Sequence, residues 1–401
     1  MKTDILIVGC GVSGLYCALN LPEDKNVTIV TKNIACKSDS YLAQGGICVL
    51  RDEDDFEAFF EDTMKAGHYE NRKESVEIMI RSSRGVIDHL LKLGVRFDMN
   101  PDGSLNYTRE GAHSRPRICF HKDITGKEIT TVLQKRVREL PNVTVMEFTA
   151  MTDILVSGGA CTGMIAKTEK GEILHIHTRD TVMATGGIGG LYEHSTNFPC
   201  LTGDALAIAK KYGVELENMD YVQIHPTSLY SEKPGRSFLI SESARGEGAV
   251  LLNGRGERFV DELLPRDVVT KEIHAEMERE GSRHVWLSFE PVGEAQIRNH
   301  FPNIYRRCLE EGYDITKEPI PVVPAQHYFM GGIHVDCNSR TTMDHLYAVG
   351  ETSCNGVHGK NRLASNSLLE SLVFAQRAAA SMAEGRKGSI KYESNYHAAC
   401  C

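Results

Sequence analysis

The first 30 residues combine two short apolar runs with one segment of helical spacing. Residues 5–8 (ILIV) are apolar without interruption and lead into Gly9, residues 12–21 carry apolar side chains at helical spacing, and residues 27–30 (VTIV) form a second apolar run. A strand, a helix and a strand within about 30 residues are typical of a βαβ unit. The turn after the first strand reads GCGVSG, a complete GxGxxG in the context that distinguishes a dinucleotide-binding fingerprint from a chance match.

The glycines of this turn have separate expected uses. Gly9 and Gly11 would let the backbone approach a pyrophosphate, and Gly14 would let the helix pack closely on the strand. A turn that serves packing alone is the less favoured alternative, because strands flank the unit. Dinucleotide-binding proteins often end the second strand with an acid that binds a ribose, but this chain has Thr31 and Lys32 there. That departure weakens a simple NAD site and favours a lysine that contacts a phosphate or carbonyl of a longer dinucleotide.

Two later segments repeat the pattern of a strand that ends in glycine. Residues 181–187 (TVMATGG) and 346–351 (LYAVGE) are both apolar runs followed by glycine. Ligands of doubly wound sheets bind beyond the carboxyl ends of the strands, so three such strands predict one extended cofactor. FAD is long enough to contact all three.

The composition changes between Asp220 and Phe329, where charge-rich helical segments such as residues 266–281 alternate with glycine-containing turns, one of them at residues 233–235. We predict an inserted capping domain at residues 220–329, with residues 1–219 and 330–401 forming the two parts of an FAD-binding domain. The predicted fold is therefore α/β, a doubly wound, glutathione-reductase-like Rossmann domain with an inserted α+β cap. The cleft between the two domains is the expected substrate site.

Composition narrows the function classes. A chain of 401 residues is long enough for two or three domains, and its net charge of −9 disfavours nucleic acid as a partner. No run of about 18 apolar residues is present, so no membrane span is expected. The 12 cysteines form no CxxC unit, which predicts reduced thiols in the cytoplasm and no metal site.

A capped helix is expected near the end of the chain. Ser367 and Glu370 have the spacing of an S-x-x-E capping box before the helix-favouring residues 371–383. Its N-terminal amides would favour the negative charge of a reduced flavin, although an ordinary capped helix is the simpler alternative. Arginines and histidines of the kind that bind a small dicarboxylate lie elsewhere in the chain, because guanidinium groups bind carboxylates bidentately and imidazoles donate directed hydrogen bonds. They are His225, Arg245, Arg266, His327 and Arg362, and Ser241 and Glu242 are candidates beside them.

Several motifs, taken in order, resemble the fumarate reductase and succinate dehydrogenase flavoprotein superfamily. They are GCGVSG, SYLAQGG, ATGG, QIHPTSLY, SESARGEGA, LLPRD, PAQHYFMGGI and VGETSCNGVHGKNRLASNSLLE. Within the superfamily, residues 109–118 (REGAHSRPRI) are similar to the RExxHSxxRI segment of L-aspartate oxidases, whereas relatives that act only on dicarboxylates differ there. Members usually continue into a C-terminal helical domain, which we expect to be missing from a chain that stops at Cys401.

The resemblance implies a role for each matching residue. Arg266 corresponds to the catalytic arginine, and Glu110 to the residue that meets the amino group of aspartate. Asp39 stands where succinate dehydrogenases have a flavin-linking histidine, which implies noncovalent FAD. The other implied catalytic residues are His225, His327 and Arg362, and the implied substrate-binding residues are Gln223, Ser241, Glu242 and Arg245. The implied FAD-binding residues are Gly9, Gly11, Val12, Ser13, Gly14, Lys32, Ser40, Gln44, Gly45, Gly46, Ala184, Thr185, Gly186, Asp204, Glu351, Ser365, Ser367 and Leu368.

The implied reaction is oxidation of L-aspartate to 2-iminosuccinate, the first step of de novo NAD biosynthesis, with fumarate or O2 as electron acceptor. Quinolinate synthase would consume the product. The main alternative is a soluble fumarate reductase or succinate dehydrogenase flavoprotein, and a flavin-binding module without turnover is a weaker one. Glu110 distinguishes these alternatives unless it only pairs with Arg109, Arg115 or Arg117, which flank it closely.

Overall fold

The computed structural model describes residues 1–233 and 235–384, so Pro234 of the predicted turn and the last part of the predicted FAD-binding domain lie outside it. Its centre is a five-stranded parallel sheet with the order β18-β10-β1-β2-β6. The strands are β1 (Ile5–Val8), β2 (Val27–Val30), β6 (Val143–Met146), β10 (Asp180–Met183) and β18 (Leu346–Ala348). The three predicted glycine-terminated strands, β1, β10 and β18, are neighbours, which confirms the predicted sheet.

Both faces of this sheet are buried, which explains why its strands are continuous apolar runs. Ile5 and Ile7 belong to the core beneath one layer of helices, while Leu6 and Val8 belong to the core on the opposite face. The first layer contains α1 (Val12–Leu19), α4 (Lys73–Leu93), α5 (Thr125–Arg138) and α11 (Asn366–Glu384). The second contains α6 (Asp204–Lys211) and an antiparallel sheet of β7 (Thr149–Ser157), β8 (Ala160–Thr168) and β9 (Ile173–His177).

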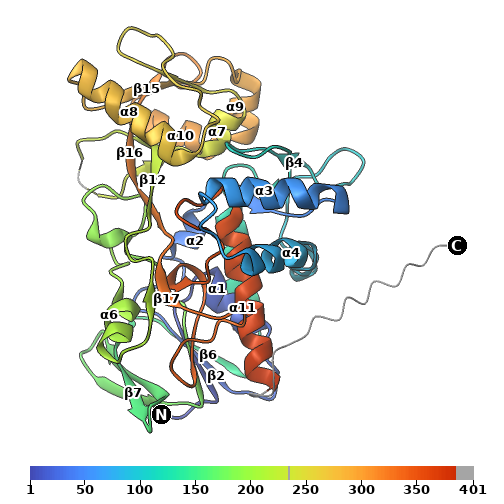
Figure 1. Cartoon of the computed structure of the whole chain (residues 1–401), viewed down its shortest axis with the longest axis vertical. Helices are drawn as coiled ribbons and strands as arrows, with labels where there is room; N and C mark the ends of the chain where they lie inside the picture. Colours follow the sequence, from blue (N-terminus) through green and yellow to red (C-terminus); the bar gives the residue numbers. More distant parts are fainter. Residues whose placement is uncertain (234, 385–401) are drawn as a thin grey trace, which may run out of the picture.

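The cap stands at one end of the molecule, joined to the rest by a long strand pair (Figure 1). β12 (Val222–Leu229) runs into the cap and β16 (Ile320–Phe329) returns, antiparallel to it, from the Val222–Phe329 pair onward. We propose that the two domains divide at the base of this pair. The other cap elements are β13 (Phe238–Leu239), α7 (Glu242–Gly246), β14 (Val250–Leu252), α8 (Arg266–Glu280), β15 (Val285–Ser288), α9 (Glu294–His300) and α10 (Pro302–Glu310).

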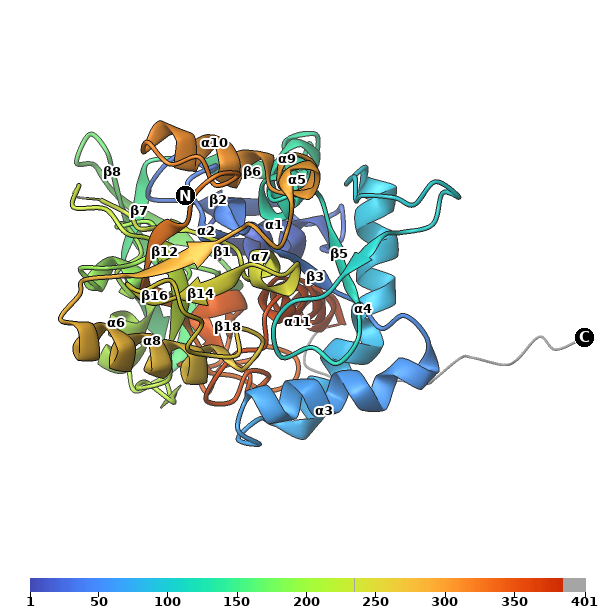
Figure 2. The same ribbon diagram turned by 90° about the horizontal axis from the view of Figure 1, so that it is seen from above.

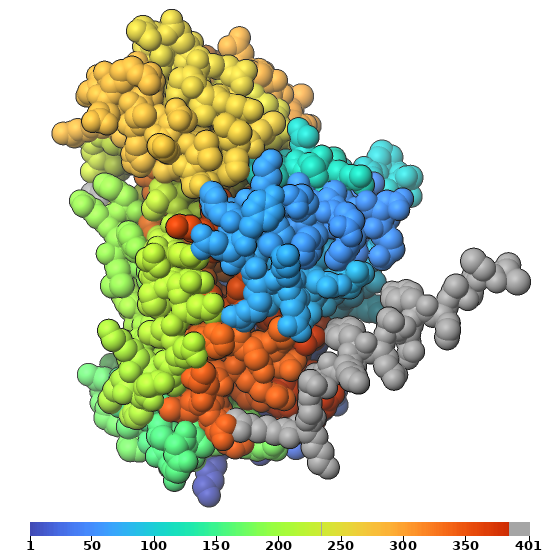
Figure 3. Space-filling model, in the orientation of Figure 1, coloured from blue at the N-terminus to red at the C-terminus, as the bar shows by residue number. Residues whose placement is uncertain are grey.

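A segment of the first part of the chain lies against the cap, as the space-filling view shows (Figure 3). It contains α3 (Phe56–Ala66) and α4, and from above α4 lies on the side opposite to α6 (Figure 2). The remaining elements are α2 (Asp39–Leu42), β3 (Gly46–Cys48), β4 (Tyr107–Thr108), β5 (Ile118–Phe120), β11 (Leu216–Glu217), β17 (Gly332–His334), β19 (Ser353–Cys354) and the 3-10 turns η1 (Glu53–Asp55), η2 (Gly189–Leu191) and η3 (Gly350–Thr352). None of the helices within residues 1–233 and 235–384 is long and apolar enough to span a membrane.

The predicted capping box at the last helix is wrong. α11 begins at Asn366, so Ser367 lies inside its first turn and not before it. The Ser367 hydroxyl accepts a hydrogen bond from Arg362 Nη1 at 2.9 Å. Glu370 accepts from Asn355 Nδ2 and does not reach back to a cap residue. The S-x-x-E spacing is therefore incidental here, because both side chains serve the neighbouring loop at residues 355–362. By contrast, α8 spans the predicted helix and ends at Gly281 in the left-handed conformation.

Candidate active site

One continuous cavity begins at the carboxyl ends of β1, β10 and β18 and reaches the base of the cap. Most of the predicted FAD-binding residues line it: Gly9, Gly11, Ser13, Lys32, Ser40, Gln44, Gly45, Gly46, Ala184, Thr185, Gly186, Asp204, Glu351, Ser365, Ser367 and Leu368. Val12 and Gly14 do not line it, because both belong to the packed interior of α1. The Val12 amide donates to Ser40 Oγ at 3.2 Å.

The glycines of the first turn do not divide their uses quite as predicted. A Cβ on Gly14 would lie 2.2 Å from the Gly9 carbonyl oxygen, so Gly14 permits the close helix packing that was expected. A Cβ on Gly9 would lie 1.9 Å from the Ala184 carbonyl oxygen, so the neighbouring strand end also requires a glycine at this position of the cavity wall. A Cβ on Gly11 would lie 3.2 Å from Ser40 Oγ and 3.9 Å from Ser38 Cβ. Gly11 is the glycine free to admit a ligand at close range.

The chemistry of the cavity wall fits a dinucleotide flavin. Ser38 Oγ, Asp39 Oδ2 and Gln44 Oε1 are buried without hydrogen-bond partners and belong to residues that line the cavity. Buried polar atoms normally have partners, so these atoms are suited to a polar cofactor. Lys32 Nζ lies 2.6 Å from Asp204 Oδ2, which places a paired cation at the end of β2.

Two carboxyl groups in this wall favour their protonated forms. Desolvation by the cavity wall raises the pKa of Asp39 to about 7, although the Phe198 amide, which donates to it at 2.9 Å, opposes the shift. Desolvation, with the nearby Asp39 carboxyl, raises the pKa of Glu351 to about 8. Asp39 thus occupies the wall as a hydrogen-bonding group and offers no imidazole to a flavin.

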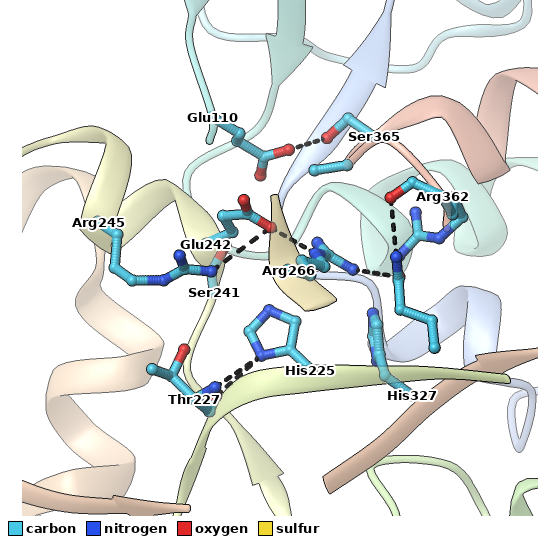
Figure 4. A network of polar contacts seen from close by, with 12 residues as sticks. Glu110, His225, Thr227, Ser241, Glu242, Arg245, Arg266, His327, Arg362 and Ser365 are labelled. Atoms are coloured by element: carbon cyan, nitrogen blue, oxygen red, sulfur yellow. Dashed lines mark hydrogen bonds and ion pairs between the residues drawn. The ribbon is translucent and has the colours of Figure 1, made fainter. Parts of the chain in front are cut away.

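At the cap end, two histidines project from the paired strands β12 and β16 (Figure 4). His225 is fully buried, and its Nδ1 accepts the Thr227 amide at 3.1 Å. The same Nδ1 lies 3.1 Å from the Thr227 carbonyl oxygen, and His225 Nε2 is buried without a protein partner. His327 Nδ1 contacts Thr196 Oγ1 at 2.7 Å. Burial, followed by the charge of Arg266, lowers the pKa of both rings well below the usual value, so both are neutral.

Arg266 and Arg362 line the same end of the cavity. Arg266 begins α8 and donates through Nε to Glu242 and through Nη1 to Gln223 Oε1 at 2.8 Å. Arg362 lies over the Tyr328 ring, 4.6 Å from its centroid, and its Nε is buried without a partner. Burial lowers the pKa of Arg362 to about 10, so the guanidinium remains charged at neutral pH.

Ser241 and Glu242 line the cavity, but two predicted substrate-binding residues, Gln223 and Arg245, do not. Gln223 positions the two arginines: its side chain accepts a hydrogen bond from Arg266 and donates one to the Arg362 carbonyl at 2.8 Å. Arg245 lies behind Glu242, with its Nη2 3.6 Å from Glu242 Oε2 and its Nη1 bonded to the Glu262 carbonyl at 2.5 Å. Both residues hold the side chains that face the cavity.

Glu110 lies beside this cluster and is 3% exposed. Its Oε1 accepts from Ser243 Oγ at 2.8 Å and its Oε2 from Ser365 Oγ at 2.5 Å. Burial, followed by the charge of Glu242, raises the pKa of Glu110, whereas Arg266 and Arg245 outweigh burial and lower the pKa of Glu242.

Two of the three arginines near Glu110 in sequence, Arg115 and Arg117, bind elsewhere. Arg117 pairs with Asp55 and Asp62, and Arg115 donates to the Asp54 carbonyl. The alternative that Glu110 pairs with one of these two arginines is therefore wrong. Glu110 instead faces the cavity with the predicted dicarboxylate-binding side chains.

Comparison with known proteins is consistent with this geometry. The family described as FAD binding domain matches residues 4–368. L-aspartate oxidases from Clostridium perfringens and Clostridium acetobutylicum are 51% and 50% identical over 377 and 380 residues, which is 94% of this chain and 85% and 87% of those proteins. This chain belongs to the L-aspartate oxidase family.

The L-aspartate oxidase family shares its fold with fumarate reductases. The E. coli quinol fumarate reductase structure is 32% identical, with a TM-score of 0.90, and the match covers 96% of this chain and 70% of that one. An open conformation of a flavocytochrome c3 fumarate reductase matches with a TM-score of 0.74 at 24% identity, which shows the fold alone.

Sequence reasoning missed three residues that shape the cap end. Tyr328 carries Arg362 on its ring, Thr196 contacts His327, and Ser243 binds Glu110. Tyr328 and Ser243 lie within motifs that carry the family resemblance, so they were visible but had no stated role. Thr196 lies between the ATGG and QIHPTSLY motifs and belongs to neither, and only the packing of residues 195–197 against β16 reveals it.

Proposed function

We propose that this protein uses noncovalent FAD to oxidise L-aspartate to 2-iminosuccinate, the first step of de novo NAD biosynthesis. The observation that carries the proposal is a carboxylate, Glu110, in the same cavity wall as the dicarboxylate-binding set. Substrate carboxylates would meet Arg266, Arg362 and the unpartnered Nε2 of His225. The substrate ammonium would meet Glu110.

FAD, when bound, supplies an acceptor for a hydride from the substrate α-carbon. The protein's own residues must do the rest. Neutral imidazoles donate hydrogen bonds to carboxylates without adding charge, and the fixed guanidinium groups orient both ends of the substrate. An ammonium has no lone pair, so Glu110 is suited to hold the substrate nitrogen and accept its proton before oxidation.

Fumarate reduction in the same site is the second function that an observation favours. Arg266, Glu242 and Arg245 form a chain of buried ion pairs that leads away from the cavity. Such a chain is suited to deliver a proton to carbon, which fumarate reduction requires and amine oxidation does not. Fumarate could therefore serve as electron acceptor for the same enzyme, with O2 as the other candidate.

We also propose a cytoplasmic location and consumption of the imine by quinolinate synthase. Ten cysteines among the described residues are free, as expected in a reducing compartment. The imine is prone to hydrolysis, so an enzyme that condenses it promptly would be expected to follow.

The test is an anaerobic mixing experiment. L-aspartate should bleach the flavin absorbance of the FAD-bound protein, and added fumarate or O2 should restore it at rates that identify the preferred acceptor. Hydrolysis of the product should give oxaloacetate and ammonia in equal amounts. Bleaching by succinate but not by L-aspartate would contradict the proposal and favour the dicarboxylate alternative.

The noncovalent attachment has its own test. Acid precipitation should release all FAD into the supernatant, because Asp39 offers no imidazole for a covalent bond. Flavin fluorescence that stays with the precipitated chain would contradict this.

A further inference from the structure

Glu110 is held by hydroxyl groups from two distant parts of the chain. Ser365 stands immediately before α11 in the FAD-binding part, and Figure 4 shows its bond to Glu110. Ser243 lies on α7 in the cap and binds the other carboxylate oxygen. The Ser241 hydroxyl in turn donates to Ser243 Oγ at 3.1 Å. Glu110 is thus the point at which cap and FAD-binding part share one hydrogen-bond chain.

Ser243 does not reach the cavity. It is 3% exposed and is absent from the cavity wall, whereas Glu110 and Ser241 line it. The Ser243 hydroxyl therefore meets the cavity only through the two wall residues that it contacts, Glu110 and Ser241.

The backbone around this contact leaves little room for adjustment. A Cβ on Gly246 of α7 would lie 2.3 Å from the Arg109 carbonyl oxygen, and a Cβ on Gly111 would lie 2.3 Å from Glu242 Oε1. A Cβ on Gly45 would lie 2.4 Å from Glu110 Oε1. Glycine at these three positions lets α7, the loop at residues 109–111 and residue 45 close directly around the two carboxylates.

The hydrogen bond from Ser243 affects the charge state of Glu110. Burial and the neighbouring Glu242 carboxylate both raise the pKa of Glu110, which favours the uncharged form. The Ser365 hydroxyl, the charge of Arg266 and the Ser243 hydroxyl act in the opposite direction, in that order, since a donated hydrogen bond or a nearby cation stabilises a carboxylate. An uncharged Glu110 would lose its Coulomb attraction for an ammonium group.

We propose that Ser243 is a positioning residue that orients Glu110 and keeps it ionised, so that a side chain of the cap sets the preference for an amino-dicarboxylate over a plain dicarboxylate. This inference rests on the proposed function. It assigns the amine preference to a contact between the cap and the FAD-binding part, and not to Glu110 alone.

The test is Ser243→Ala in the FAD-bound protein. Loss of one hydrogen bond to a charged group should lower kcat/KM for L-aspartate about tenfold near neutral pH. The acid limb of its pH profile should move to higher pH, because that limb reports the pKa of the ionised base in the free enzyme. Fumarate reduction should stay within about twofold of the unaltered protein, because fumarate carries no ammonium group.

Ser288→Ala is the matched control. Ser288 is a buried cap serine whose hydroxyl accepts the Glu290 amide at 3.3 Å, away from the cavity wall. It should leave both activities and the pH profile unchanged.

A second background tests whether Ser243 acts through Glu110. In Glu110→Gln, residue 110 no longer titrates, so adding Ser243→Ala should produce no further shift of the acid limb. A shift that persists there would overturn the inference, as would a Ser243→Ala profile that matches the unaltered protein. Equal losses with L-aspartate and fumarate would also overturn it. If the unaltered protein fails to oxidise L-aspartate, the proposed function itself fails, which is a separate result from any of these.

Discussion

The two ends of the cavity are built by different means. At the nucleotide end, the wall combines glycines at the ends of β1 and β10 with polar side chains of the neighbouring loops. At the cap end, the wall is charged and polar side chains from β12, α7, α8, β16 and the loop before α11. The nucleotide end depends on close approach of main chain, whereas the cap end depends on a balance of buried charge.

That balance explains which ligand the cap end can hold. Arg245, Arg266 and Arg362 are buried there, and the pKa of Glu242, the carboxyl group that pairs with Arg266 and Arg245, is lowered. The pKa of the second carboxyl group, Glu110, is raised. Without substrate the cluster therefore carries excess positive charge, and buried charge is costly unless it is paired. A dicarboxylate supplies the missing negative charge, and an amino group on it then makes ionised Glu110 favourable.

The largest expected effect is at the cap end, in Arg266→Leu. The change removes a charged donor and leaves the buried Glu242 with Arg245 as its remaining partner. Such losses typically cost about 2 to 5 kcal/mol, or about 30-fold and upward in kcat/KM for L-aspartate. FAD content should be unchanged, because the nucleotide end is untouched. Parallel loss of FAD would show that the two ends are not independent.

Arg266→Lys separates the charge of Arg266 from the geometry of its guanidinium group. It keeps a cation but loses the fork that binds Glu242 and Gln223 together. Fumarate reduction, which needs a proton on carbon, should suffer more than L-aspartate oxidation. Steady-state kinetics with both substrates measures this, and equal damage would make Arg266 a binding residue only.

At the nucleotide end, Gly9→Ala and Gly11→Ala should separate folding from binding. An alanine Cβ at position 9 would overlap the Ala184 carbonyl, and Gly9 has φ of +120°, so we expect a loss of about 2 to 4 kcal/mol in the free energy of unfolding. The alanine Cβ of Gly11→Ala meets only the side chains of Ser40 and Ser38, at 3.2 and 3.9 Å, so the FAD-free protein should keep its stability while FAD affinity falls. Denaturant unfolding and FAD titration measure the two quantities. Equal destabilisation by both changes would contradict this division.

The smallest effect is a pH dependence from Asp39. Its pKa is raised from 3.8 to about 7, so between these values the folded FAD-free protein holds a proton that the unfolded chain releases. The free energy of unfolding therefore falls as pH rises through that range. Asp39→Asn should make the decline in Tm between pH 5 and pH 8 smaller by about 2 °C or more. The same substitution at exposed Asp220 is the control, and an unchanged slope in Asp39→Asn would contradict the assignment.

The difference between the ends also explains what the sequence could reveal. The nucleotide end follows from contiguous patterns, because a strand, a turn and a helix that bind a pyrophosphate are neighbours in the chain. Glu110 and Ser365 are 255 residues apart, and no local periodicity predicts that they touch. Residues of the cap end were identified by resemblance to a family, and their division into cavity-lining and supporting roles, as for Gln223 and Arg245, required the fold.

Local patterns also failed where tertiary contacts compete with them. Ser367 and Glu370 have the spacing of a capping box, but Arg362 and Asn355 bind them instead. Gly9 lines the cavity, but the neighbouring strand end also requires a glycine there, which the motif alone did not indicate. In both cases a contact with a segment that is distant in sequence constrains the residue, and the local motif does not reveal that contact.

Glu110 is proposed to recognise the amino group of the substrate, and the Glu110→Gln variant isolates that role. Glu110→Gln keeps the side-chain volume and removes the charge, so kcat/KM for L-aspartate should fall at least about tenfold, equivalent to about 1.4 kcal/mol. Fumarate reduction by the same preparation should be nearly unchanged, because fumarate has no ammonium group to attract. A parallel loss of both activities, or no loss of either, would contradict the amino-group assignment.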